Sequence, residues 1–164
     1  MPKYLVTLFI AAGILIIYFF LLRPVRADIN ENILLPIIEH SVNNGSNTSI
    51  GYEAGSRVST RIFWGEVSSL NEFYIAVPFG LQFLIGMLGL VSIRADKKYY
   101  LALVIIQVVG GILTVSFFYL GALYLKYLLI CADLTIRYLT PLCSLGTVPL
   151  AFIQKRQQLH EARA

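Results

Sequence analysis

The sequence predicts an all-α membrane protein, a four-helix transmembrane bundle with a 50-residue extracytoplasmic loop between its first and second helices. Two observations predict this class. Of the 164 residues, 57% are hydrophobic and only 13% are charged, whereas a soluble domain carries about 25% charged residues. Four stretches also approach the roughly 20 apolar residues that a helix needs to cross a bilayer. The same composition excludes a disordered chain and a disulfide-dense scaffold, since only two cysteines are present.

The four predicted spans occupy residues 4–22, 73–93, 99–125 and 134–153. The first three contain no charged residue, and the third has 27 residues, enough to tilt or to project beyond the bilayer. The fourth is the least apolar and carries Pro141 and Pro149, which are expected to kink it. We therefore expect the fourth span to pack inside the bundle or against another subunit rather than to face lipid.

The first span is expected to be an uncleaved signal anchor with its N-terminus in the cytoplasm. Its apolar run is longer than the roughly 7–15 residues of a signal peptide, and no small-residue cleavage site follows it. Lys and Arg residues near the spans favour the cytoplasmic side. Placing both termini there puts seven of these residues inside and six outside. The densest basic clusters, 94–98 and 155–156, then lie inside, so residues 154–164 are predicted to be a cytoplasmic tail.

The predicted loop at residues 23–72 has three parts. An apolar patch at 33–38 favours either an interfacial element lying on the membrane or a turn packed on the helix ends. A turn-rich stretch follows, in which Asn44 and Asn47 each begin a glycosylation acceptor pattern. Alternating apolar residues between 49 and 65 then favour a short β-hairpin with its turn near 54–56. Two strands alone are marginally stable, so the hairpin is expected to lean on the helices or on a partner chain.

Small and polar residues mark the predicted packing faces of the second and third spans. These residues are Gln82, Gly86, Gly89, Gln107, Gly111 and Thr114. The two spans are joined by a tight turn and must be antiparallel neighbours, so the amides of Gln82 and Gln107 are expected to hydrogen-bond. Small residues let helices approach closely, and polar side chains add hydrogen bonds. Helix packing is the favoured interpretation, and a transport path or substrate site is the alternative.

A second group of polar residues is predicted to lie at the outer leaflet. It comprises Arg57, Arg61, Lys126, Asp133 and Arg137. Asp133 and Arg137 are four residues apart and can pair on one helical turn. The favoured interpretation is an ion pair that caps the bundle at the membrane surface, with the loop arginines solvated. The alternative is a polar site in which the basic residues bind a phosphate, a carboxylate or a partner peptide.

The sequence lacks the residue patterns of common membrane enzymes. Cys131 and Cys143 are twelve residues apart, about 18 Å along one helix, which is far beyond disulfide reach. His40 and His160 fall on opposite sides of the membrane in the predicted topology, which excludes a two-histidine metal or haem site within one chain. No HExxH, Gly-rich phosphate loop or GxSxG motif occurs. We therefore expect no catalytic residue, no metal and no cofactor.

The order of the segments is a long first outer loop, a tight inner turn, a short second outer segment and a basic tail. This layout resembles that of claudin-type tetraspan proteins. Trp64 and Gly65 lie in the first loop, while the paired loop cysteines of that family are absent, so the resemblance is one of topology. Small four-span companions of bacterial envelope-processing systems are an equal alternative.

These observations predict a non-catalytic integral membrane subunit or accessory protein of a larger assembly. We expect it in the plasma membrane or the bacterial inner membrane, with other membrane subunits as partners and no nucleic acid. The alternative is a lipid- or small-molecule-handling protein, a carrier or an enzyme, that uses the polar site at the outer leaflet. The net charge of +4 reflects the orientation of the spans rather than a nucleic-acid partner.

Overall fold

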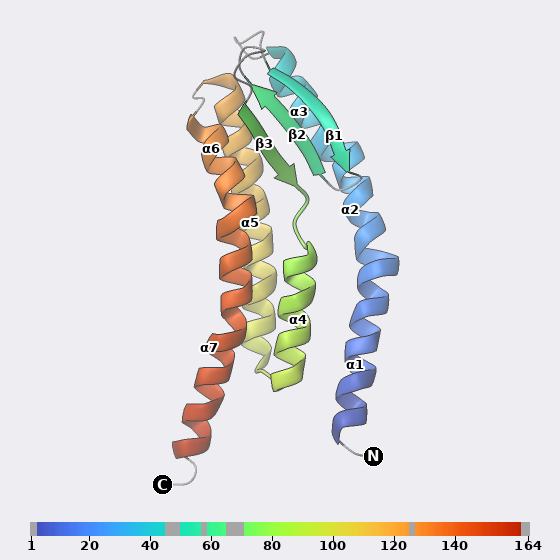
Figure 1. Ribbon diagram of the computed structural model, residues 1–164, viewed down its shortest axis with the longest axis vertical. Helices are drawn as coiled ribbons and strands as arrows, with labels where there is room; N and C mark the ends of the chain where they lie inside the picture. The colour runs from blue at the N-terminus through green and yellow to red at the C-terminus, as the bar shows by residue number, and fades with distance from the viewer. Residues whose placement is uncertain (1–2, 45–49, 57–58, 65–70, 125–126, 162–164) are drawn as a thin grey trace.

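One unbroken helix forms the N-terminal part of the computed structural model, which describes residues 3–44, 50–56, 59–64, 71–124 and 127–161 (Figure 1). At 1.5 Å per residue this helix is about 60 Å long, twice the thickness of a bilayer core. Its consecutive segments are α1 (Lys3–Ile17), η1 (Tyr18–Leu22), α2 (Arg23–Ile29), η2 (Asn30–Leu34) and α3 (Leu35–Asn44). The structure thus differs from the predicted loop at 23–72, because residues 23–44, with the apolar patch, continue the first span as helix.

Each wide, π-helical turn in the described residues ends two residues before a proline. The segment η1 precedes Pro24, η2 precedes Pro36, and η3 (Thr135–Leu139) precedes Pro141. Proline has no N–H to donate, and its ring presses on the carbonyl four residues earlier. A wider turn at that carbonyl relieves the pressure and lets the helix continue. The distortion predicted at Pro141 therefore takes the form of a widened helical turn just before this proline.

Three antiparallel strands follow the first helix in the order β1 (Ile50–Ser56), β2 (Ser59–Trp64) and β3 (Asn71–Ala76). The register pairs Tyr52 with Ile62 and Ile62 with Phe73. The two strands expected between residues 49 and 65 are thus present. The third strand lies where the second span was predicted to begin, so the sheet is larger than the sequence indicated.

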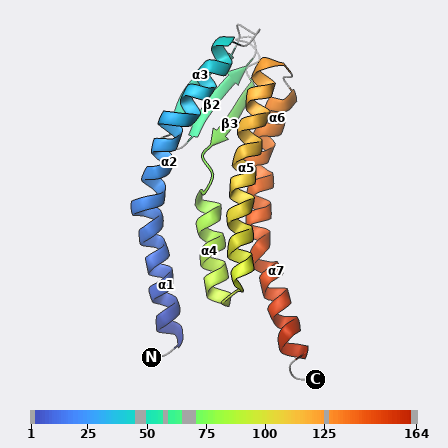
Figure 2. The same ribbon diagram turned by 180° about the vertical axis from the view of Figure 1, so that it is seen from behind.

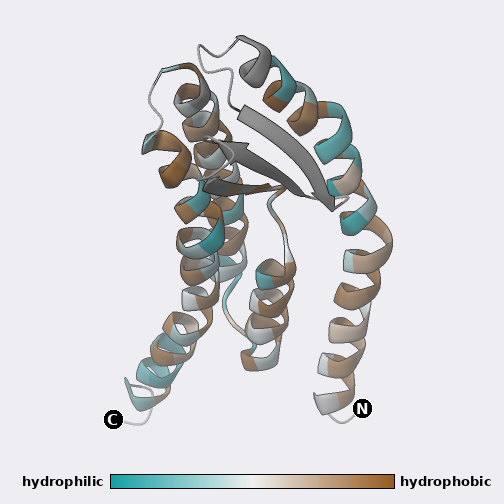
Figure 3. Ribbon diagram, turned by 45° about the horizontal axis from the view of Figure 1, so that its top comes forward, coloured by the Kyte–Doolittle hydropathy of each residue, from teal (hydrophilic) through white to brown (hydrophobic). Residues whose placement is uncertain are grey.

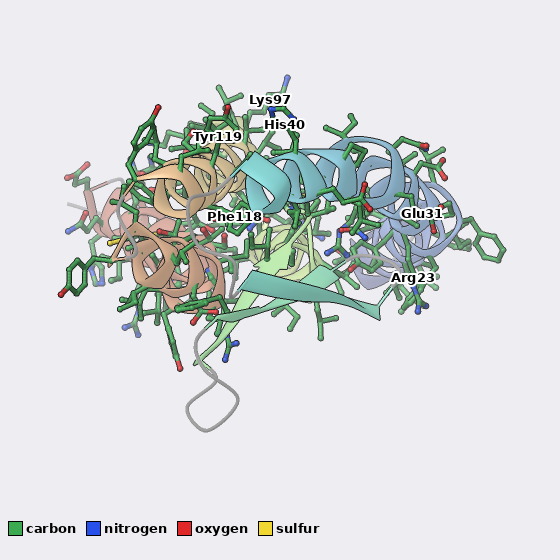
Figure 4. The ribbon with its side chains drawn as sticks, turned by 90° about the horizontal axis from the view of Figure 1, so that it is seen from above. Arg23, Glu31, His40, Lys97, Phe118 and Tyr119 are labelled. Atoms are coloured by element: carbon green, nitrogen blue, oxygen red, sulfur yellow. The ribbon has the colours of Figure 1, made fainter. Side chains whose placement is uncertain are left out.

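A packed core joins this sheet to the helices at the end of the molecule opposite the termini, here called the sheet end. Figure 4 looks down on it, with Phe118 lying between the sheet and the surrounding helices. The core contains Leu34, Ile38, Phe73, Ile75, Val77, Phe118, Leu129 and Ala132. These residues come from the first helix, from β3 and the residue after it, and from α5 (Lys97–Leu123) and α6 (Tyr127–Leu134). The sheet is therefore stabilised by packing against the helices, since strands without such packing are marginally stable.

The second predicted span, 73–93, is a strand and a short helix rather than one helix. Phe73, Ile75 and Val77 are buried at every second position, which is the period of a strand. Phe79 then adopts a positive φ of 64°, and helix α4 (Leu81–Ile93) begins only after Gly80. With 13 residues, α4 is about 20 Å long, shorter than a bilayer core.

Three helices in the described part of the chain are long and apolar enough to cross a membrane: Leu5–His40, Lys97–Gly121 and Tyr127–Glu161. The last of these joins α6, η3 and α7 (Thr140–Glu161) into one helix. The short helix α4 lies between α1 on one side and α5 with α7 on the other (Figure 2). Both ends of the chain lie at the same end of the molecule (Figure 1), here called the termini end.

Figure 3 shows mainly hydrophobic residues along α1 and α4, and polar contacts lie at both ends of the apolar parts of the helices. At the termini end, Arg94 Nη2 donates to Thr7 Oγ1 at 3.5 Å, and Lys155 Nζ donates to the Arg94 carbonyl at 3.4 Å. Near the point where β3 ends lie Arg26 and the Asp133–Arg137 pair. Along the chain, 19 residues separate Thr7 from Arg26 and 18 separate Arg137 from Lys155, so the levels are about 27–28 Å apart. That spacing matches a bilayer core of about 30 Å.

Candidate functional site

A buried polar cluster holds the centre of the bundle together, and we call it the Gln107 clasp. Gln107 is fully buried; its Oε1 accepts the backbone N–H of Phe79 at 2.7 Å, and its Nε2 donates to Ser144 Oγ at 2.7 Å. Ser144 Oγ donates in turn to the Thr140 carbonyl at 2.7 Å. The clasp therefore joins α5 and α7 to the strained turn before α4. An amide suits this place because it accepts and donates at the same time.

The bond predicted between Gln107 and Gln82 is not formed, because both hydrogen bonds of Gln107 go elsewhere. Gln82 lies in the first turn of α4, where its Oε1 lies against Gly80. Thr114 is buried and donates to the Gly110 carbonyl at 2.7 Å on its own helix. The partners of the Gln107 side chain were not predicted. Phe79 was expected to lie inside the second span, where its backbone N–H would have bonded to a carbonyl of the same helix.

The predicted small residues lie at tight contacts between elements. A methyl group on Gly86 would meet the Leu103 methyls of α5 at 3.1 and 3.2 Å, and one on Gly89 would meet a Val148 methyl of α7 at 2.9 Å. A methyl group on Gly111 would meet the Pro78 ring at 2.9 Å. These positions put α4 and its preceding turn against α5 and α7 at close range, which only small residues allow.

A second buried polar group lies on the first helix and centres on Arg26, which the sequence patterns did not single out. Arg26 is 8% exposed; its Nη2 donates to the Val77 carbonyl at 2.8 Å and its Nη1 to Tyr18 Oη at 3.4 Å. Asn30, one turn further, is 1% exposed, and its Oδ1 accepts no hydrogen bond from the described residues. Arg26 thereby ties the first helix to the chain between β3 and α4.

The signal for this group is a row of residues four apart. Arg26, Asn30, Leu34 and Ile38 are buried at successive steps of four, and Tyr18 is buried two such steps before Arg26. Every fourth residue of a straight α-helix advances by about 40°, so such a row would wind off one face. The two wide turns η1 and η2 slow this winding and keep the row facing the sheet and α5. In the sequence, the spacing of these residues by four, together with Pro24 and Pro36, is the pattern that indicates this row.

Replacing Arg26 by alanine is expected to lower the free energy of unfolding by about 2 kcal/mol, because its short hydrogen bond to the Val77 carbonyl comes from a charged donor and such a bond is worth about 1.5–3 kcal/mol. Arg23 is exposed on the same helix, and Arg23→Ala is the matched control, with an expected change below about 0.5 kcal/mol. Reversible unfolding in mixed detergent, followed by circular dichroism, measures both. Equal losses in the two variants would contradict the role given to Arg26.

The predicted outer-leaflet site is present only in part within the described residues. Arg137 Nε donates to Asp133 Oδ1 at 2.7 Å, four residues apart on the α6–η3 helix, with Arg137 39% and Asp133 17% exposed. Strand β2 places Arg61 opposite Glu53 in register. Arg57 and Lys126 lie outside the described residues. A half-exposed pair of this kind contributes about 0–1 kcal/mol to stability.

The described residues hold little that could carry covalent or metal chemistry. No group of three or more His, Cys, Asp or Glu side chains lies together in them. Cys131 and Cys143 are exposed free thiols on the helix that runs from α6 to α7. Comparisons of the chain with known protein families, curated proteins and solved structures find no match.

Proposed function

We propose that this chain is a non-catalytic integral membrane subunit or accessory protein, whose spans carry a small folded unit that engages other members of an assembly. This projecting unit consists of the first helix beyond Arg26, the three strands, the last turns of α5, and α6. The observation that supports the proposal most is its buried core, in which Ile38, Ile75 and Phe118 are at most 1% exposed. Because the first helix and α5 enter this core directly, the unit is fixed to the spans rather than tethered by a loop.

The polar side chains buried among the spans also support a structural role. Gln107 and Ser144 bond to each other, and Thr114, Thr135 and Thr147 bond to backbone carbonyls of their own helices. Polar groups that line a transport path would instead face water or substrate. In the proposed arrangement α1, α4, α5 and α7 form the membrane bundle, and α4 reaches only part of the way across.

Gentle-detergent purification of the tagged chain from its native membrane is the direct test. Under the proposal, a second membrane protein co-purifies at fixed stoichiometry, and a photo-crosslinking residue at exposed Ile33 of the projecting unit forms an adduct with it. The same residue at exposed Leu142, at the level of the bilayer, serves as the control and should label lipid. A monodisperse monomer that gives no protein adduct at Ile33, while the residue at Leu142 still labels lipid, would sink the proposal.

We further propose that both termini lie in the cytoplasm and the projecting unit lies outside. Arg94, Lys97, Lys98, Lys155 and Arg156 gather at the termini end, and basic residues favour the cytoplasmic side. Reporter fusions at Ser46 and at Ala95 measure this: alkaline phosphatase should be active at Ser46 only, and green fluorescent protein bright at Ala95 only. The reverse pattern would invert the topology.

The second candidate function is lipid or small-molecule handling at the outer leaflet, and the Asp133–Arg137 pair favours it. Under this alternative, Arg137→Ala and Asp133→Ala each abolish an activity while stability changes by less than about 1 kcal/mol. Under the accessory role, both variants retain the partner and its stoichiometry. The two functions are therefore separated by the same pair of variants.

A further inference from the structure

An apolar groove of about 690 Å³ runs between α1 and α4 at the termini end. Its walls are formed by Ile10 and Ile14 of α1 and by Met87 and Val91 of α4, and its mouth by Thr7 and Arg94. Eight residues separate the extreme wall positions on α1, Val6 and Ile14, so the groove is about 12 Å long. It extends from the level of the polar contacts at the termini end toward the middle of the bilayer.

The mouth of the groove is basic. Arg94 ends α4 with a positive φ of 52° and is exposed, and Lys155 Nζ donates to the carbonyls of Ile93 and Arg94. The lysine therefore offsets the negative charge at the carbonyl end of α4. Lys97 and Lys98 follow at the start of α5, against the single acidic residue Asp96. Arg94 is the one charged residue among those that line the groove, and the neighbouring lysines add positive charge at the same end of the helices.

We propose that this groove binds a phospholipid with an anionic headgroup from the leaflet at the termini end. One acyl chain lies along Ile10, Ile14, Met87 and Val91, and the headgroup phosphate contacts the Arg94 guanidinium at the mouth. Basic pockets between transmembrane helices are suited to such headgroups. A partner helix fits less well than a lipid. A spanning helix has about 30 Å of apolar surface, whereas the groove is about 12 Å long. Such a helix also brings no negative charge to pair with Arg94 at the mouth of the groove. The inference goes beyond the proposed function and does not depend on it.

The test is native mass spectrometry of the full chain in a neutral detergent, titrated with phosphatidylglycerol or with phosphatidylcholine. Arg94→Asn removes the charge and keeps the backbone, because asparagine tolerates positive φ. Val91→Phe fills the groove from α4, and Ile10→Phe fills it from α1, in case one of the two fails to fold. Arg156→Gln is the matched control, since Arg156 lies at the same end but stacks on Phe152 of its own helix.

The wild-type chain is expected to retain phosphatidylglycerol in preference to phosphatidylcholine. Arg94→Asn should lower that preference about fivefold, the effect of one basic residue near a headgroup, while Arg156→Gln leaves it unchanged. A groove-filling variant should reduce the retention of both lipids. If Arg94→Asn and Arg156→Gln lowered the preference for phosphatidylglycerol equally, the preference would come from general surface charge. That result would overturn the proposed site. Undiminished lipid retention in a folded Val91→Phe or Ile10→Phe variant would also overturn it.

Discussion

Replacing Gln107 by leucine is expected to lower the free energy of unfolding by about 2–4 kcal/mol. The leucine fills a similar volume but leaves the backbone N–H of Phe79 buried without an acceptor, which costs about 1–3 kcal/mol. It also removes the bond to Ser144, and such contacts between membrane helices are worth about 0.6 kcal/mol on average. Because the Phe79 turn connects β3 to α4, the loss should reach both the bundle and the projecting unit.

Ser144→Ala is the matched control for this variant, because it removes one partner of Gln107 and leaves the Phe79 bond in place. Its expected loss is about 0.6–1 kcal/mol. Unfolding in mixed detergent gives both values, and the double variant should lose less than the sum of the single losses, since the two residues share a bond. If Gln107→Leu cost no more than Ser144→Ala, the Phe79 N–H would have another acceptor and the clasp would not hold the turn.

Gly110→Ala is expected to destabilise the protein by about 2–3 kcal/mol, in the range of overpacked cores. A methyl group there would come within 2.3 Å of Thr140 Oγ1, 2.9 Å of its Cγ2 and 3.1 Å of its Cβ. Thr140 is itself buried, so the clash is relieved only by moving α5 and α7 apart. A shift of thermal unfolding in detergent measures the loss.

Gly146→Ala is the control for the glycine substitution, because nothing lies within 4 Å of the added methyl group. Alanine favours a helix over glycine by roughly 0.5–1 kcal/mol, so this variant should be slightly more stable than the wild type. Shortening the clashing side chain in the double variant Gly110→Ala, Thr140→Ala should recover most of the loss. Failure of that rescue would mean that the α5–α7 contact is not the source of the cost.

The sequence predicted the long helices well and the boundary between membrane and projecting unit poorly. Apolar content alone indicated the third span, predicted at 99–125 and observed as α5 at Lys97–Leu123. The first span was predicted to end at Leu22 because charged residues follow it. Charged residues can end an apolar segment without ending the helix that contains it. The helix therefore runs on to Asn44, carried by residues whose burial depends on partners distant in the sequence.

The second span shows why hydropathy could not separate a strand from a helix. Residues 73–77 are apolar at every position, although only the odd-numbered side chains are needed for the core. Pro78 and Gly80 were the local signal that the run is interrupted. For the candidate sites, the burial of Gln107 was predictable from a polar residue in an apolar span. Its partners were not, because Phe79 reaches it only through a turn with positive φ.

The continuous first helix has a mechanical consequence. In the proposed arrangement, this helix of about 60 Å has its N-terminal half in the bilayer and its other half in the projecting unit, so it would act as a lever across the membrane surface. Tilting it by about 5° about its inner end moves the far end by about 5 Å, on the scale of one helical turn. Because Arg26 joins this helix to the residue after β3 near the midpoint of the helix, we expect a displacement of α1 by a lipid or a neighbouring subunit to move the sheet as well.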